Sequence, residues 1–201
     1  MTQAELKNVL KRLEKDLILA KLDLSEYQDL YLSDPKNGAL MDKVSTNWFS
    51  RLRDFYWHRF ALAICRLTDP AEQGRFENLT LSVLIKYAVT NRLKFIPELR
   101  EECKGIKEIR DKYYPLRSKI IAHRDRAIAL TDPAVLGDFH IDEVQECLNR
   151  ISTCINLFKI ELFNREMDHE LSTQMTSNLV LKYLELGVKY EEEQIQNSRT
   201  K

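Results

Sequence analysis

The sequence predicts an all-α protein, built as an up-and-down helical bundle. Apolar residues recur at steps of three and four along most of the 201-residue chain, which is the period of an α-helix. Five glycines and five prolines are few helix breakers for this length, so the elements should be long. No segment shows the sustained alternation of a β-strand. We therefore expect about five to seven helices with short links, the last one appended to the bundle.

The first predicted helix covers residues 3–32. Thr2 is a good N-cap, and Glu5 three residues later completes a capping box. A loop should follow at 33–38, where Asp, Pro, Asn and Gly cluster. The helical period of this segment is set by Leu6, Leu10, Leu13, Leu17 and Ala20.

A second helix is expected from about Asp42 to Leu67. It should stop at Thr68-Asp69-Pro70, because the residue before a proline resists the helical conformation. Its aromatic content is compatible with a base-stacking surface, but at helical spacing it is typical of a core stripe. That predicted stripe consists of Trp48, Leu52, Phe55, Tyr56, Phe60, Ile64 and Leu67.

The remaining helices follow the same logic. A polar loop at 70–78 precedes an apolar helix that ends near Val89. A longer helical region at 98–122 should be interrupted at Pro115, because proline lacks the N–H that a helix interior needs. Its apolar stripe comprises Ile106, Ile109, Tyr113, Leu116 and Ile120.

The C-terminal third holds a loop at 131–138, a helix at 141–165 and a last helix at about 172–196. The whole chain, 1–201, is predicted to be a single helical domain. Its core should cover about 45–165, and the first and last helices should pack on that core or extend it.

Composition excludes some classes of protein. Thirty-one basic and 31 acidic residues give zero net charge, so a strongly basic nucleic-acid coat is excluded while a local basic cleft is not. The charged N-terminus has no apolar signal region, and no stretch is long and apolar enough to span a membrane. Four cysteines without a CxxC pair are typical of buried thiols in a reducing compartment rather than zinc ligands or disulfides. We expect a cytoplasmic protein without a cofactor or metal.

One segment is locally basic. Between Lys112 and Arg126 stand five basic residues and one acid, Asp125. His123 lies near the expected end of the helix, and the surrounding cations should lower its pKa and favour the neutral base. An adjacent Arg could hold a phosphate and stabilise the charge that develops during its transfer. The supporting side chains in this segment are Ser118, Lys119, Arg124, Asp125 and Arg126.

A plainer interpretation of this segment is that it is structural. Basic residues near a helix C-terminus are favoured by the helix dipole, and a capping His would give much the same pattern. Geometry adds one constraint. On an ideal helix with Leu116 at zero, Arg117 falls at about +100° and His123 at about −20°, so the two side chains bracket the apolar stripe. A two-fold pairing of helices would bring the pair of one chain against the pair of another.

Several segments together resemble a known family. Arg117-Ser118, followed after four residues by His123, resembles the Arg–polar–His signature of HEPN proteins. The stretch from Leu116 to Asp125 is similar to the abortive-infection (AbiU-type) branch of that superfamily. So are Arg66-Leu67-Thr68-Asp69-Pro70 and Asn78-Leu79-Thr80-Leu81-Ser82. The likeness covers about residues 45–165.

The resemblance implies a helical homodimer whose paired motifs cut RNA without metal and leave a 2′,3′-cyclic phosphate. By position, Arg117 would stabilise the phosphate and His123 would act as base or acid. Ser118 departs from the Asn, Asp or His that is commoner in the family. The family also implies toxin–antitoxin or phage-defence settings, often beside a nucleotidyltransferase-type antitoxin partner. The alternatives are a catalytically inactive HEPN module that binds nucleotide, RNA or such a partner, and a structural helical interaction protein.

Overall fold

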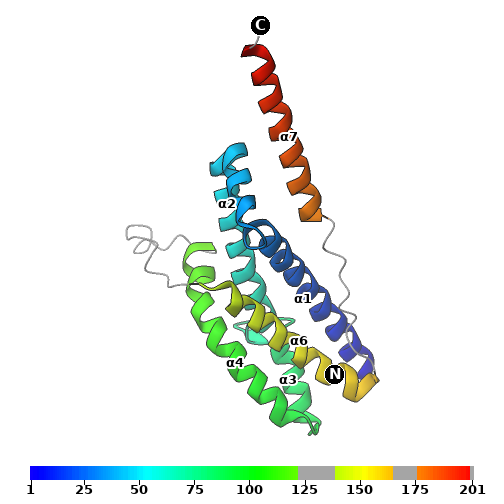
Figure 1. Ribbon diagram of the computed structural model, residues 1–201. Helices are drawn as coiled ribbons and strands as arrows, with labels where there is room; N and C mark the ends of the chain where they lie inside the picture. Colours follow the sequence, from blue (N-terminus) through cyan, green and yellow to red (C-terminus); the bar gives the residue numbers. More distant parts are fainter. Residues whose placement is uncertain (122–138, 165–175, 200–201) are drawn as a thin grey trace. The chain divides into compact units, whose positions relative to one another are not determined.

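The computed structural model describes residues 1–121, 139–164 and 176–199. They fall into two compact units. The first unit comprises residues 1–21 and 58–169, and the second comprises 22–57 and 170–201. Most of the described residues are helical, which confirms the all-α prediction (Figure 1). None of the described helices combines the length and the apolar character needed to cross a lipid bilayer.

The elements follow the predicted order, with one addition. Residues 72–77 form a hairpin of two antiparallel two-residue strands, β1 (Glu72–Gln73) and β2 (Phe76–Glu77). Gly74 in its turn has φ of 62°, a backbone conformation that glycine adopts without steric cost. The helices are α1 (Gln3–Tyr31), α2 (Pro35–Thr68), α3 (Leu81–Thr90), α4 (Ile96–Pro115), α6 (Ile141–Phe163) and α7 (Thr176–Arg199), and a π-helix, η1 (Leu116–Ile121), follows α4.

Helix α2 begins earlier than the sequence pattern predicted. The loop expected at 33–38 is shorter, because Pro35 is already the first helical residue and the Asp34 side chain accepts a hydrogen bond from the Lys36 amide at 2.8 Å. An Asp followed by a proline at the first helical position starts a helix as readily as it makes a loop. The backbone is non-helical at Ser45, with φ −172° and ψ 95°, so a kink divides α2 close to the start of the helix predicted at 42–67.

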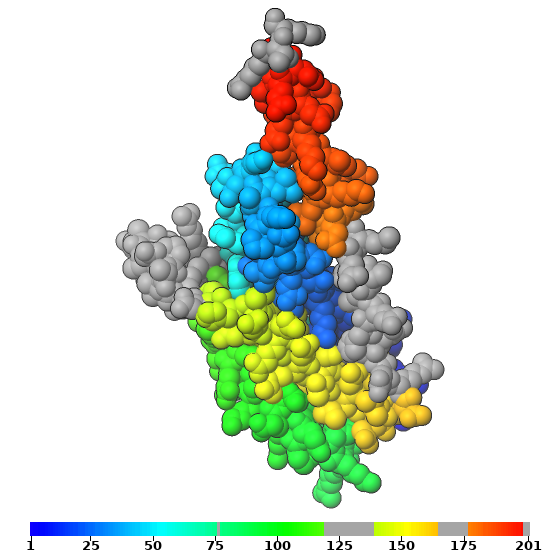
Figure 2. Space-filling model, in the orientation of Figure 1, coloured from blue at the N-terminus to red at the C-terminus, as the bar shows by residue number. Residues whose placement is uncertain are grey.

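The first unit is built on α4 and α6, which pack side by side (Figure 2). The Lys112 ammonium lies 2.7 Å from a carboxylate oxygen of Glu143, and the buried Tyr113 hydroxyl donates to the His140 carbonyl at 3.1 Å. The predicted capping box at the start of α1 is confirmed by hydrogen bonds in both directions between Thr2 and Glu5. The buried side chains of this unit include Leu6, Leu10, Leu13, Leu17, Ala20, Phe60, Ile64, Leu67, Ile106 and Leu116, as their spacing predicted.

The second unit has an aromatic interior. The Tyr27 ring contacts the Tyr31 and Tyr56 rings at centroid distances of 5.1 and 5.9 Å. The predicted core stripe of α2 was wrong at two positions, since Trp48 and Phe55 are 56% and 52% exposed. Both lie on a different face of the helix from the buried Tyr56. The aromatic residues of α2 therefore divide between two faces, a division that hydrophobicity alone does not reveal.

Candidate functional site

Helix α2 ends in a polar elbow at Thr68, Asp69 and Pro70. The Thr68 hydroxyl donates to the Ile64 carbonyl at 2.6 Å, and the Asp69 amide donates to the Cys65 carbonyl at 2.7 Å. Pro70 then stops the helix, as expected of a residue without an N–H. The Asp69 side chain is left at the helix end, and the residue is 7% exposed.

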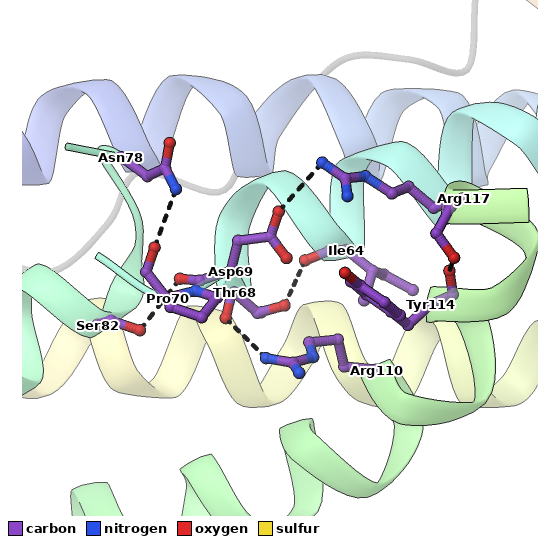
Figure 3. A network of polar contacts seen from close by, with 10 residues as sticks. Ile64, Thr68, Asp69, Pro70, Asn78, Ser82, Arg110, Tyr114 and Arg117 are labelled. Carbon is purple, nitrogen blue, oxygen red and sulfur yellow. Dashed lines mark hydrogen bonds and ion pairs between the residues drawn. The ribbon is translucent and has the colours of Figure 1, made fainter. Parts of the chain in front are cut away.

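The segment after the hairpin holds this elbow in place. The Asn78 side-chain amide donates to the Pro70 carbonyl at 3.0 Å, and the Ser82 hydroxyl donates to the Asp69 carbonyl at 3.1 Å (Figure 3). The two sequence segments singled out above, 66–70 and 78–82, are thus in direct contact. Hydrogen bonds to the elbow's carbonyls fix the backbone that carries the Asp69 carboxylate.

The third segment reaches the site through an irregular turn. Pro115 cannot donate a backbone hydrogen bond, and the chain continues from it as the π-helix η1. The Ser118 hydroxyl donates to the Tyr114 carbonyl at 2.8 Å, which satisfies one of the carbonyls at this break. Because a π-turn is wider than an α-turn, the ideal-helix angles predicted for Arg117 and His123 do not apply here.

Arg117 points from η1 to the elbow. Its Nη2 lies 3.5 Å from Oδ2 of Asp69, and its guanidinium sits 5.8 Å from the centre of the Tyr114 ring (Figure 3). The Arg110 guanidinium also lies 5.8 Å from that ring, and its Nη1 donates to the Thr68 carbonyl at 3.4 Å. The Arg117 side chain is 28% exposed. It is therefore held by a carboxylate and a ring, yet remains accessible.

Charge at the site is only partly satisfied. Within the described residues, Oδ1 of Asp69 is buried and accepts no hydrogen bond. Arg117 has five N–H donors, of which one makes a long ion pair with Asp69. The pKa of the neighbouring Cys65 thiol is raised to about 11, chiefly by burial and also by the Asp69 charge, while Arg117 and Arg110 oppose the rise. The remaining Arg117 donors are suited to a phosphate, which guanidinium groups bind in a bidentate manner.

The structure describes part of the predicted site. Arg117 and Ser118 are placed as above, and Lys119 is described by its backbone alone. The other predicted residues, His123, Arg124, Asp125 and Arg126, lie outside the described residues. The association of Arg117 with His123 therefore stays a prediction. The Ser118 hydroxyl, predicted as the polar neighbour of Arg117, donates its hydrogen to the Tyr114 carbonyl.

Sequence reasoning gave no role to three residues that the structure brings to Arg117. Asp69 was quoted in the resemblance, but nothing in its local pattern shows that it meets a residue 48 positions later. Arg110 and Tyr114 could have been found, because they stand at i−7 and i−3 from Arg117 and so share its helix face until the π-turn begins.

Comparison with known proteins identifies the family. The family model described as AbiU2, a HEPN family, matches residues 3–177. This match covers most of the chain, so the chain belongs to the AbiU2 family of abortive-infection HEPN proteins. No curated protein and no solved structure matched the chain.

Proposed function

We propose that this AbiU2-family protein is a metal-independent endoribonuclease that acts as a homodimer in an abortive-infection or toxin–antitoxin setting. The observation that supports it most is the state of Arg117. A buried carboxylate and an aromatic ring fix the guanidinium, while most of its donors have no partner among the described residues. A preorganised, accessible cation is the group that stabilises a phosphate on which charge develops.

The proposed reaction needs a base, an acid and positive charge. The base removes the proton from an RNA 2′-hydroxyl, whose oxygen then attacks the adjacent phosphorus. The bond from phosphorus to the 5′-oxygen breaks, and the acid returns a proton to that oxygen, leaving a 2′,3′-cyclic phosphate and a 5′-hydroxyl. His123 is the proposed base or acid, and Arg117 stabilises the charged phosphate oxygens. Every step balances without a metal.

The proposed dimer supplies the second proton-transfer group. One chain offers a single Arg117 and a single His123, whereas in-line attack uses a base and an acid on opposite sides of the phosphate. A two-fold interface doubles each group from one surface patch, and such isologous dimers are the commonest oligomers. Light scattering should then give about twice the chain mass of 23.7 kDa.

A non-catalytic HEPN module is the second candidate, and one observation favours it. The hydroxyl of Ser118, at the position where a polar residue of the active site is expected, donates to the Tyr114 carbonyl and supports the π-turn. A module of this kind would bind RNA, a nucleotide or a nucleotidyltransferase-type partner and would not cut RNA.

Cleavage of RNA in EDTA separates the two candidates. The purified protein should cut an unstructured RNA without added metal and leave a 2′,3′-cyclic phosphate end. Arg117→Ala should reduce the rate at least about a hundredfold, the loss typical of one removed charge-stabilising donor, and His123→Ala should be similarly inactive. Arg150→Ala is the matched control, because the Arg150 side chain is also ion-paired and 31% exposed, but its partners are Glu102 and Glu146 and not the elbow.

Two results would contradict the enzyme. The first is RNA that stays intact at high protein concentration but is shifted in a gel, which would identify the binding module. The second is cleavage that requires added magnesium, because that result would contradict the metal-independent mechanism. Circular dichroism of each variant should retain the wild-type helical spectrum, so that loss of folding is not mistaken for loss of chemistry.

A further inference from the structure

A cleft of about 860 Å³ adjoins Arg117 in the first unit. Residues of α1, α2, η1 and the segment that leads from β2 to α3 line it. Asp69 and Thr80 belong to its lining, and each is more than nine-tenths buried. Within the described residues, each also has a side-chain oxygen without a hydrogen bond. The cleft is thus continuous with the candidate site, and two polar atoms of its lining residues are unsatisfied.

The charge of this cleft differs from that of other clefts in the described structure. Four basic and three acidic side chains line it, whereas three other clefts of the described structure have no net positive side-chain charge. Two of the three acids are already paired, Asp69 with Arg117 and Asp16 with Arg66 at 3.2 Å. Arg12 and Lys15 are exposed and have no carboxylate partner within the described residues. These two cations are therefore available to an anion in the cleft.

The cleft also has an apolar component. Leu19, Leu62 and Leu79 line it, and they are 44%, 41% and 43% exposed. Exposed leucines beside unpaired cations suit a ligand with both flat apolar faces and negative charges. Unpaired RNA has both, because its bases can leave the stack while its phosphates follow a basic groove. A duplex keeps its bases paired and would reach the cations but not the leucines.

We propose that this cleft binds unpaired RNA next to the bond that Arg117 acts on, with Arg12 and Lys15 on the phosphates and the leucines against a base. This inference rests on the proposed function and deepens it, because it names single-stranded RNA as the substrate class.

Fluorescence anisotropy with a labelled, unstructured oligoribonucleotide tests the cleft. The double variant Arg12→Gln/Lys15→Gln should bind roughly tenfold more weakly. The plot of log binding constant against log salt concentration should become less steep by about 1.4, which is about 0.7 for each single-strand phosphate contact that is lost. Leu62→Gln should weaken binding and leave that slope unchanged. The control Lys11→Gln/Lys107→Gln removes two exposed cations outside the cleft and should bind like wild type.

The results separate this inference from the proposed function. Wild-type protein that binds through Arg12 and Lys15 without cutting RNA would defeat the enzyme and support the cleft. Cleavage with an unchanged KM in the Arg12→Gln/Lys15→Gln variant would overturn the cleft and leave the enzyme standing. Equal affinity for a hairpin duplex would overturn single-strand recognition. If light scattering shows that the double variant dissociates a wild-type dimer, the surface is a subunit contact and the inference is wrong.

Discussion

Two arginines of the first unit, Arg117 and Arg150, have similar exposure and different surroundings. Their side chains are 28% and 31% exposed. Arg150 lies 3.1 Å from Glu102 and 2.9 Å from Glu146, and the two carboxylates raise its pKa. Arg117 has one carboxylate within ion-pair distance among the described residues, at 3.5 Å. Exposure and charge alone therefore do not distinguish an arginine held in a structural ion pair from one proposed to bind a phosphate.

The difference lies in how much of each guanidinium is already used. Arg150 makes three short, charge-assisted contacts to two carboxylates, and the α4 backbone at Gly105 leaves room for its planar group. Such an arginine joins α4 to α6 and has little capacity for a ligand. Arg117 is oriented by one long ion pair and by the Tyr114 ring, and within the described part of the chain its other donors have no partner. An oriented but unsatisfied cation is what a phosphate site requires.

Replacing the carboxylate beside each arginine should show the largest difference between the roles of Arg117 and Arg150. Asp69→Asn keeps the size of the side chain but removes the charge that orients Arg117. We expect kcat for RNA cleavage to fall about ten- to hundredfold, since small misplacements of a catalytic group have costs of this order. KM should change little, because Asp69 acts through Arg117.

Glu102→Gln is the matched change at Arg150. It should leave cleavage unaltered and lower the stability by less than about 1 kcal/mol, as expected for a partly exposed pair. Asp69→Glu should recover part of the activity by restoring the charge. Equal cleavage rates for wild type and Asp69→Asn would show that Asp69 does not contribute to the reaction. If Glu102→Gln lowered kcat as much as Asp69→Asn, the proposed difference between the two arginines would be wrong.

Each arginine also has a buried thiol nearby that reports on its surroundings. Burial raises the pKa of Cys65, beside Asp69, to about 11, and that of Cys147, beside Arg150, to about 12. Both thiols should therefore alkylate slowly at pH 8, with rates that rise about tenfold per pH unit below the pKa. Asp69→Asn removes a negative charge that disfavours the Cys65 thiolate, so its pKa should fall.

Alkylation followed by peptide mass spectrometry measures this effect. Labelling of Cys65 should be roughly two- to tenfold faster in Asp69→Asn, for a change of up to one pKa unit, while Cys147 serves as the internal control. An unchanged Cys65 rate would mean that the Asp69 charge does not reach it. All four cysteines should label after denaturation without reductant, and fewer would contradict the prediction of free thiols.

The helices were predictable because they depend on local periodicity. The buried positions of α1 and the stop at Pro70 follow from spacing and proline chemistry alone. The aromatic residues of α2 were less predictable, because Trp48 and Tyr56 have similar hydrophobicity and the three-dimensional fold decides which face is covered. The early start at Pro35 was missed because Asp-Pro is typical of both loops and helix starts.

The sequence indicated residues of the candidate site but not how they contact one another. The basic segment drew attention to Arg117, and the resemblance drew attention to the segment that contains Asp69. Their contact joins the end of α2, which Pro70 marks, to the π-helix η1, which has no local signature beyond Pro115. Nothing in either local pattern indicates that the two meet. The same limit applies to Arg150, whose partner Glu102 stands 48 residues away.

Substitution of Gly105 tests how strongly the Arg150 guanidinium is held in its position, and its expected effect is the smallest. A Cβ built at this glycine would lie 2.7 Å from Cζ and Nε of Arg150. Gly105→Ala should therefore push the guanidinium away from Glu102 and weaken a pair of about 0.2–1 kcal/mol. Alanine also favours the helix by about 0.8–1 kcal/mol over glycine. The two effects oppose each other, so the stability of the wild-type background should change little.

The two effects separate once the obstructing side chain is removed. In an Arg150→Ala background, Gly105→Ala should stabilise the protein by the full helix-propensity gain of about 1 kcal/mol, or about 2–4 °C in Tm for a chain of this size. Gly187→Ala is the control, because its added Cβ would meet no atom within 4 Å, so it should have the same effect in both backgrounds. The stability change caused by Gly105→Ala in the Arg150→Ala background, minus that in the wild-type background, gives the free-energy cost of displacing the Arg150 guanidinium. If it were zero, Arg150 would tolerate displacement as freely as a ligand-binding arginine, and the contrast with Arg117 would have no energetic basis.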